Sequence, residues 1–108
     1  MKKFDVVFDT NAEDDVFDIY AYVAVNDSIE RADKLLSALR RTCSKLKTLP
    51  HRGNVPPELF EIGVVEFREI RYKPYRILYS IDRSTVYVHC VLDGRRDLQT
   101  LLQERLMR

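Results

Sequence analysis

Hydrophobic and polar residues follow two different periods along the chain, and the period predicts the type of each element. Residues 3–9 alternate with a period of two, which predicts a short strand with one mostly apolar face. Thr10, followed by Glu13, is a capping-box pattern and predicts the start of a helix. Hydrophobic residues then recur at helical spacing, so we expect this helix to run to about Val25.

A second helix is predicted after a break at residues 26–27, with Asp27 or Ser28 as its N-terminal cap. Its apolar stripe continues until Pro50, which cannot extend a helix. The opposite face of this helix is mostly basic. Two helices joined by so short a break predict an antiparallel helical hairpin.

The second half of the chain predicts a three-stranded meander followed by a helix. After a loop over residues 50–65 that admits a helical turn at 57–60, strands are expected at residues 65–72, 75–81 and 85–92, and a last helix over 97–106. Helices and strands thus form separate blocks, which is typical of an α+β fold. We expect residues 1–108 to form one domain, with an N-terminal strand, a helical hairpin packed on one face of a small antiparallel sheet, and a short C-terminal helix.

Alternation within the strands predicts which side chains face the hairpin. The inward set is expected to be Tyr75, Ile77, Tyr79 and Ile81 of the middle strand with Val86, Val88, Cys90 and Leu92 of the last strand. The opposite, uncovered face is then expected to carry Arg76, Tyr87, His89 and Val91. At least one of Arg68 and Arg71 joins it, and alternation alone does not decide which. Such a face can bind phosphate and bases or an acidic peptide. It can equally be a solvated surface on which Arg68 and Arg71 pair with Glu66 and Glu69.

Composition and charge narrow the class of protein. The net charge is +1, with 45% hydrophobic and 32% charged residues, which is a globular balance without a strong overall attraction to nucleic acid. No apolar segment follows the N-terminal lysines, and no run approaches the roughly 20 residues of a membrane helix. Cys43 and Cys90 fall on apolar faces and are expected to be buried, reduced thiols. We therefore expect a cytoplasmic protein with no membrane association, no metal site and no cofactor.

Several segments together resemble the RelE/ParE superfamily of toxins from type II toxin–antitoxin systems. They are Glu66-Phe67-Arg68-Glu69-Ile70, Tyr75-Arg76-Ile77-Leu78-Tyr79, Val86-Tyr87-Val88 and Val91-Leu92-Asp93-Gly94-Arg95-Arg96-Asp97-Leu98. The N-terminal half is similar in layout, with a short strand, a helical hairpin, and Leu49-Pro50 followed by Gly53. The resemblance implies a compact α+β toxin that is encoded beside a cognate antitoxin, whose C-terminal segment wraps the toxin.

The superfamily divides by target, and the site residues favour one branch. RelE-type toxins cut mRNA in the ribosomal A site and need an acid, a base and cations for the phosphate. Arg76 matches their sheet arginine. Residues 98–108, however, contain no Tyr, His or Trp, and Asp93 stands where many members have His. The resemblance therefore favours the ParE branch, which implies a DNA gyrase inhibitor without catalytic residues, neutralised by a ParD-like antitoxin.

Two other functions stay open. A ribosome-dependent mRNA endoribonuclease would use Arg68, Arg76, Tyr87 and His89, and a repurposed relative would only bind its antitoxin. Contacts with the target or antitoxin are expected at Arg68, Arg71, Arg76, Arg95 and Arg96. Arg95 and Arg96 are expected in the first turn of the last helix, where the helix dipole disfavours cations, so they are expected to meet a partner or to pair with Asp97 or Glu104. Asp93 is expected to cap that helix.

Overall fold

The computed structural model describes residues 3–95 and 98–106. Its elements are β1 (Asp5–Phe8), α1 (Thr10–Asn26), α2 (Ile29–Ser44), the 3₁₀ turn η1 (Lys45–Lys47), α3 (Pro57–Phe60), β2 (Arg68–Tyr72), β3 (Tyr75–Asp82), β4 (Thr85–Asp93) and α4 (Leu98–Leu106). The predicted α+β class and order of elements are confirmed, including the helical turn at residues 57–60. The first strand of the meander begins at Arg68 rather than at residue 65.

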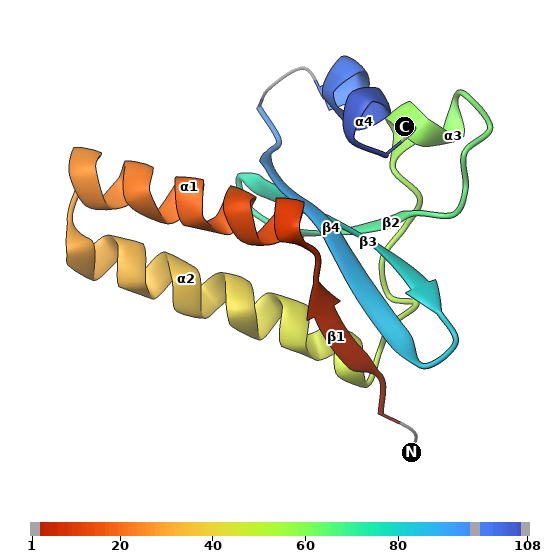
Figure 1. The fold of residues 1–108 in the computed structure, drawn as a ribbon, viewed down its shortest axis with the longest axis horizontal. Coiled ribbons are helices and arrows are strands. Elements are labelled where there is room, and N and C mark those ends of the chain that lie inside the picture. Colours follow the sequence, from red (N-terminus) through yellow and green to blue (C-terminus); the bar gives the residue numbers. More distant parts are fainter. Residues whose placement is uncertain (1–2, 96–97, 107–108) are drawn as a thin grey trace.

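The four strands form one sheet in the order β1-β4-β3-β2. β2, β3 and β4 pair antiparallel as predicted, whereas β1 pairs parallel with β4, so the sheet is mixed rather than purely antiparallel. The chain that connects β1 to β4 runs through the hairpin of α1 and α2 and then through β2 and β3, which gives the long connection that a parallel pair requires. Figure 1 shows the hairpin on one side of the sheet, and α3 and α4 next to each other and away from the hairpin.

The helix starts are set by two short polar side chains. Asp9, rather than the predicted Thr10, caps α1, because its extended backbone lets a carboxylate oxygen accept from the Ala12 N–H at 2.9 Å. Ser28 caps α2 as predicted, accepting from the Arg31 N–H at 3.1 Å. The helix α1 thus begins one residue earlier than the sequence pattern suggests, and the third residue after its cap is Ala12 rather than Glu13.

The sheet has a hydrophobic core on each face. The core between the sheet and the hairpin contains Ala12, Leu39, Cys43, Leu46, Ile77, Tyr79, Val86, Val88 and Val91. On the opposite face, Leu59, Val64, Leu78, Cys90, Leu92 and Leu102 form a second core under α3 and α4. The face that was predicted to be uncovered is therefore largely buried, and this prediction was wrong. Cys43 and Cys90 are buried free thiols, as expected, and burial raises the pKa of both to about 12.

A β-bulge explains why alternation failed in β4. The register between β3 and β4 shifts at Leu78/Tyr79, so that Leu78 pairs with Cys90 and Tyr79 pairs with Val88. His89 is the extra residue between them. A bulge of one residue exchanges the faces of all positions beyond it. Cys90 and Leu92 consequently point away from the hairpin and Val91 points toward it, the reverse of the prediction.

Candidate functional site

Arg76 lies in a buried ion-pair cluster rather than on an open surface. Its side chain is 7% exposed, and it donates to Glu69 Oε1 from Nε at 2.9 Å and to Glu58 Oε1 from Nη2 at 2.8 Å. Two further bonds join Nη1 to Glu58 and Nη2 to Glu69. Most of the guanidinium donors are therefore occupied by two carboxylates of the chain itself.

The cluster is built from β2, β3 and α3. Glu69 and Arg76 come from neighbouring strands, and Glu58 reaches them from α3 above the sheet. Hydrogen bonding to these carboxylates raises the pKa of Arg76, and hydrogen bonding to Arg76 lowers the pKa of Glu58. The net charge of the trio is −1, so it offers no cationic surface to a phosphate.

The structure separates the two arginines of β2. Arg71 pairs in register with Arg76 and bonds to Glu69 at 3.1 Å, which confirms the expected Arg71–Glu69 pair, and its side chain is 58% exposed. Arg68 pairs with Tyr79 instead and lies on the hairpin face. It donates to the Gly53 carbonyl at 2.7 Å and to the His51 carbonyl, rather than to Glu66. Of the two, Arg71 is the arginine that shares a face with Arg76.

Arg95 is an exposed cation at the end of β4. It precedes α4, which begins at Leu98, so it is not in the first turn of that helix as predicted. It pairs with Asp93 at 2.6 Å, not with Glu104. Asp93 accepts from the Arg95 N–H at 2.9 Å, which closes the turn after β4. Arg96 and Asp97 lie outside the described residues.

Tyr87 and His89 lie on the face opposite the hairpin, as predicted. Tyr87 is exposed and pairs in register with Ser80. His89 Nε2 is 2.7 Å from Ser80 Oγ, and its Nδ1 is 3.0 Å from Asp9 Oδ2. The proposed nuclease set is thus dispersed, because Arg68 is on the other face and Arg76 is buried and paired.

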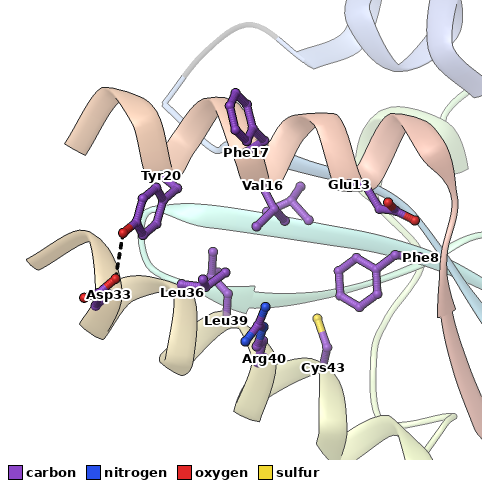
Figure 2. A pocket seen from close by; sticks show the side chains of 11 residues that line it. Phe8, Glu13, Val16, Phe17, Tyr20, Asp33, Leu36, Leu39, Arg40 and Cys43 are labelled. Atoms are coloured by element: carbon purple, nitrogen blue, oxygen red, sulfur yellow. Dashed lines mark hydrogen bonds between the residues drawn. The ribbon is translucent and has the colours of Figure 1, made fainter. Parts of the chain in front are cut away.

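A mostly apolar groove lies between α1 and α2. Its volume is about 570 Å³. Its lining includes Phe8, Val16, Phe17, Leu36, Leu39 and Cys43. Figure 2 shows Val16 and Leu36 pointing into the groove from opposite helices, with Tyr20 bonded to Asp33 at one end. Glu13, Asp33 and Arg40 supply charge at the rim, so the groove fits an amphipathic segment.

A second, polar hollow lies beside the edge strand β2. Its volume is about 400 Å³, and Lys45, Arg52 and Arg71 line it together with Glu69. Sequence reasoning named Arg71 as a binding residue and Glu69 as its partner, but it named neither Lys45 nor Arg52 as a binding residue. Lys45 and Arg52 come from segments that meet β2 only in the folded chain, so spacing gave no signal for them. Glu58, Asp9 and Ser80 were missed for the same reason.

Membrane-spanning helices and metal sites both bear on the class of protein. No helix in the described part of the chain is both long and apolar enough to cross a membrane. Among the same residues, no group of three or more His, Cys, Asp and Glu side chains is placed to hold a metal ion.

The chain is similar to known toxins in sequence pattern. Residues 6–98 match the family model described as ParE toxin of type II toxin-antitoxin system, parDE. No curated protein is significantly similar to the chain in sequence.

Solved structures with the same fold include two toxin–antitoxin systems. A chain of the chromosomal ParDE system from P. aeruginosa superposes with a TM-score of 0.71 at 15% identity, over 84% of this chain and 96% of that one. A chain of the toxin–antitoxin complex RelBE2 from Mycobacterium tuberculosis gives a TM-score of 0.63 at 24% identity, over 86% of this chain and 93% of that one. At these identities the likeness concerns the fold.

Proposed function

Because the chain belongs to the ParE toxin family of type II toxin–antitoxin systems, we propose that it inhibits DNA gyrase in the cytoplasm and arrests growth. A cognate, ParD-like antitoxin holds it inactive. The mechanism is surface recognition of the target, so no catalytic residue is required.

The observation that carries this proposal is the state of Arg76. An endoribonuclease of the RelE type must present cations to the phosphate whose charge grows in the transition state. The Arg76 guanidinium is 7% exposed and bonded to both Glu58 and Glu69. Withdrawing it leaves Glu58 unpaired and leaves Glu69, which is 1% exposed, with only the solvent-exposed Arg71 as a partner. Leaving a buried charge unpaired costs about 3–5 kcal/mol, so Arg76 is a poor phosphate ligand.

The partner surface is supported by the groove between α1 and α2. An antitoxin segment that folds as an amphipathic helix buries its apolar side against Val16, Leu36 and Leu39. The outward side of α2 carries Arg31, Lys34, Arg40 and Arg41, which attract acidic residues on the same segment. Antitoxin binding is thus proposed at the hairpin, and the sheet edge with Arg71 is left for other contacts.

The test uses toxin freed from its antitoxin in two purified reactions. In the first, gyrase supercoils a relaxed plasmid; in the second, a cell-free system translates a reporter mRNA. We expect loss of supercoiling with accumulation of cleaved DNA, and unchanged translation. Toxin already bound to the product of the neighbouring antitoxin frame is the control and is expected to spare gyrase.

The opposite pattern makes the chain a ribosome-dependent nuclease. The observation that favours this second function is the placement of His89, whose ring is held between Asp9 and Ser80. In that case mRNA is cut at the A site, gyrase stays active, and His89→Ala abolishes the cutting.

A further inference from the structure

Asp9, His89 and Ser80 form a hydrogen-bonded relay that the proposed inhibition of gyrase does not use. Ser80 Oγ is 2.7 Å from His89 Nε2, and His89 Nδ1 is 3.0 Å from Asp9 Oδ2. Both separations lie in the range of ordinary hydrogen bonds. The order of groups, carboxylate to imidazole to hydroxyl, is the order that activates a serine nucleophile in hydrolases on several unrelated folds.

The carboxylate of Asp9 fixes the proton on the imidazole. An ionised carboxylate can only accept, so Nδ1 of a neutral His89 must carry the ring proton. Nε2 is then the free acceptor, and Ser80 donates its hydroxyl proton to it. This is the tautomer that a general base needs in order to take a proton from Ser80.

Two members of the relay are each held by a further contact. Asp9 Oδ1 accepts from the Ala12 N–H at 2.9 Å, which anchors the carboxylate at the start of α1. The rings of His89 and Phe67 form a T-shaped pair with a centroid distance of 5.4 Å and an interplanar angle of 85°. Rotation of either side chain therefore breaks more than one contact. Such preorganisation is what a catalytic hydrogen-bond chain requires.

The bulge in β4 accounts for the position of His89. As the extra residue opposite Leu78 and Tyr79, it is released from strict alternation and turns toward Ser80 on the neighbouring strand. The site remains open to solvent, because the side chain of His89 is 24% exposed and that of Asp9 is 36% exposed. Tyr87 stands opposite Ser80 in register and is exposed.

We propose that Ser80 is a nucleophile activated by His89, with Asp9 as a positioning residue, and that it accepts the acyl group of small carboxylic esters. Ser80 Oγ attacks the carbonyl carbon and forms the Oγ–C bond. Its proton passes to His89 Nε2, the C–O bond to the alcohol breaks, and the proton is delivered to the departing oxygen. Water then releases the carboxylic acid by the same steps, which restores the serine.

Two probes test this activity on the full chain. A fluorophosphonate traps an activated serine, because Oγ displaces fluoride from phosphorus and the adduct does not turn over. p-Nitrophenyl acetate reports acylation by release of p-nitrophenolate. We expect one adduct per chain, mapped by mass spectrometry to Ser80, and none in Ser80→Ala. General-base catalysis contributes roughly 10²–10⁴-fold, so His89→Gln should slow both reactions at least about 100-fold.

Asp9→Asn separates positioning from folding. Asparagine caps a helix about as well as aspartate, so α1 keeps its cap and the melting temperature should change little. The amide donates to Nδ1 rather than accepting, which moves the ring proton to Nε2 and disables the base. Labelling should therefore fall although the fold persists. Ser84→Ala, in the turn after β3, is the matched control and should label like the wild type.

The proposal is overturned if Ser80→Ala is labelled as fast as the wild type, or if His89→Gln reacts at the wild-type rate. Either result makes the relay a structural link between β4 and the start of α1. Because neither probe involves gyrase or the ribosome, failure here leaves the toxin proposal untouched.

Discussion

Arg76 bonds to two carboxylates, of which Glu69 is buried and Glu58 is partly exposed. Truncation of Arg76 to alanine removes the charge and leaves Glu69, 1% exposed, without its main partner. Breaking a buried pair in this way costs about 3–5 kcal/mol. We therefore expect Arg76→Ala to lose most of its stability in urea unfolding, and to lose toxicity through unfolding rather than through lost chemistry.

Arg71→Ala is the matched control for that experiment. It removes another arginine that bonds to Glu69, but the side chain of Arg71 is 58% exposed. Exposed ion pairs contribute about 0–1 kcal/mol to stability, so the free energy of unfolding should fall by no more than that. Equal losses in the two variants would contradict the view that burial makes the Arg76 cluster important.

Glu58 makes the same cluster sensitive to acid. Hydrogen bonding to Arg76 lowers the pKa of Glu58 below its ordinary value of 4.5. The unfolded chain therefore takes up a proton at this position before the folded chain does. The stability that Glu58 contributes is fully present above pH 4.5 and is lost as the pH falls through the lowered folded-state pKa. In urea unfolding at several pH values, the difference between wild type and Glu58→Gln should shrink below pH 4.5.

At the scale of elements, periodicity predicted the helices and strands, which depend on neighbouring residues, and failed where two strands must fit against each other. The helices, the turn at residues 57–60 and the meander follow from spacing, capping residues and prolines, which act within a few positions. The bulge depends on how β4 fits against β3, and no glycine marks it in the sequence. One inserted residue, His89, therefore reversed the faces predicted for Cys90, Val91 and Leu92. The second core was missed as well, because α3 and α4 were not expected to cover the face that carries Cys90 and Leu92.

The same geometry limited prediction of the site. Alternation placed Arg76, Tyr87 and His89 opposite the hairpin correctly. It could not show that Arg76 is paired with Glu58, which is 18 residues away in the chain. Nor could it bring Asp9 to His89, since these residues are 80 positions apart. Ion pairs between distant elements need tertiary contacts, which a single sequence does not supply.

Asp15 links three elements and should control how firmly α4 is attached. Its Oδ2 accepts from the Val91 N–H of β4 at 3.0 Å and from Arg105 of α4 at 2.8 Å. Burial raises the pKa of Asp15, and hydrogen bonding to Arg105 opposes that rise.

Asp15→Ala leaves a backbone donor and a half-buried guanidinium unpaired, at a cost of about 1–3 kcal/mol. We expect faster amide exchange in α4, measured by mass spectrometry, while β3 stays protected. Asp15→Asn, which still accepts from Val91, should show a smaller effect; an unchanged α4 in both variants would contradict this role.

At the scale of the whole molecule, the sheet is covered on both faces but unequally. The side with α3 and α4 is closed by the ion-pair cluster and the second core, whereas the hairpin side keeps an open groove of about 570 Å³. The proposed antitoxin needs a surface that it can cover without unfolding the toxin. The groove meets that need, since its walls are the two long helices and its floor is the first core.

Leu36→Glu tests the groove as the antitoxin surface. Leu36 points into the groove from α2 (Figure 2), and a carboxylate there would be buried without a partner when the antitoxin helix binds. Loss of a central apolar contact of this kind costs about 2 kcal/mol or more, so the dissociation constant should rise about 30-fold or more in titration calorimetry with the antitoxin.

Ser37→Glu introduces the same charge at the next, exposed position and should leave binding nearly unchanged. Melting temperatures of both variants, together with Leu36→Ala as a milder truncation, separate lost binding from lost folding. Undiminished affinity in a folded Leu36→Glu protein would place the antitoxin elsewhere on the molecule.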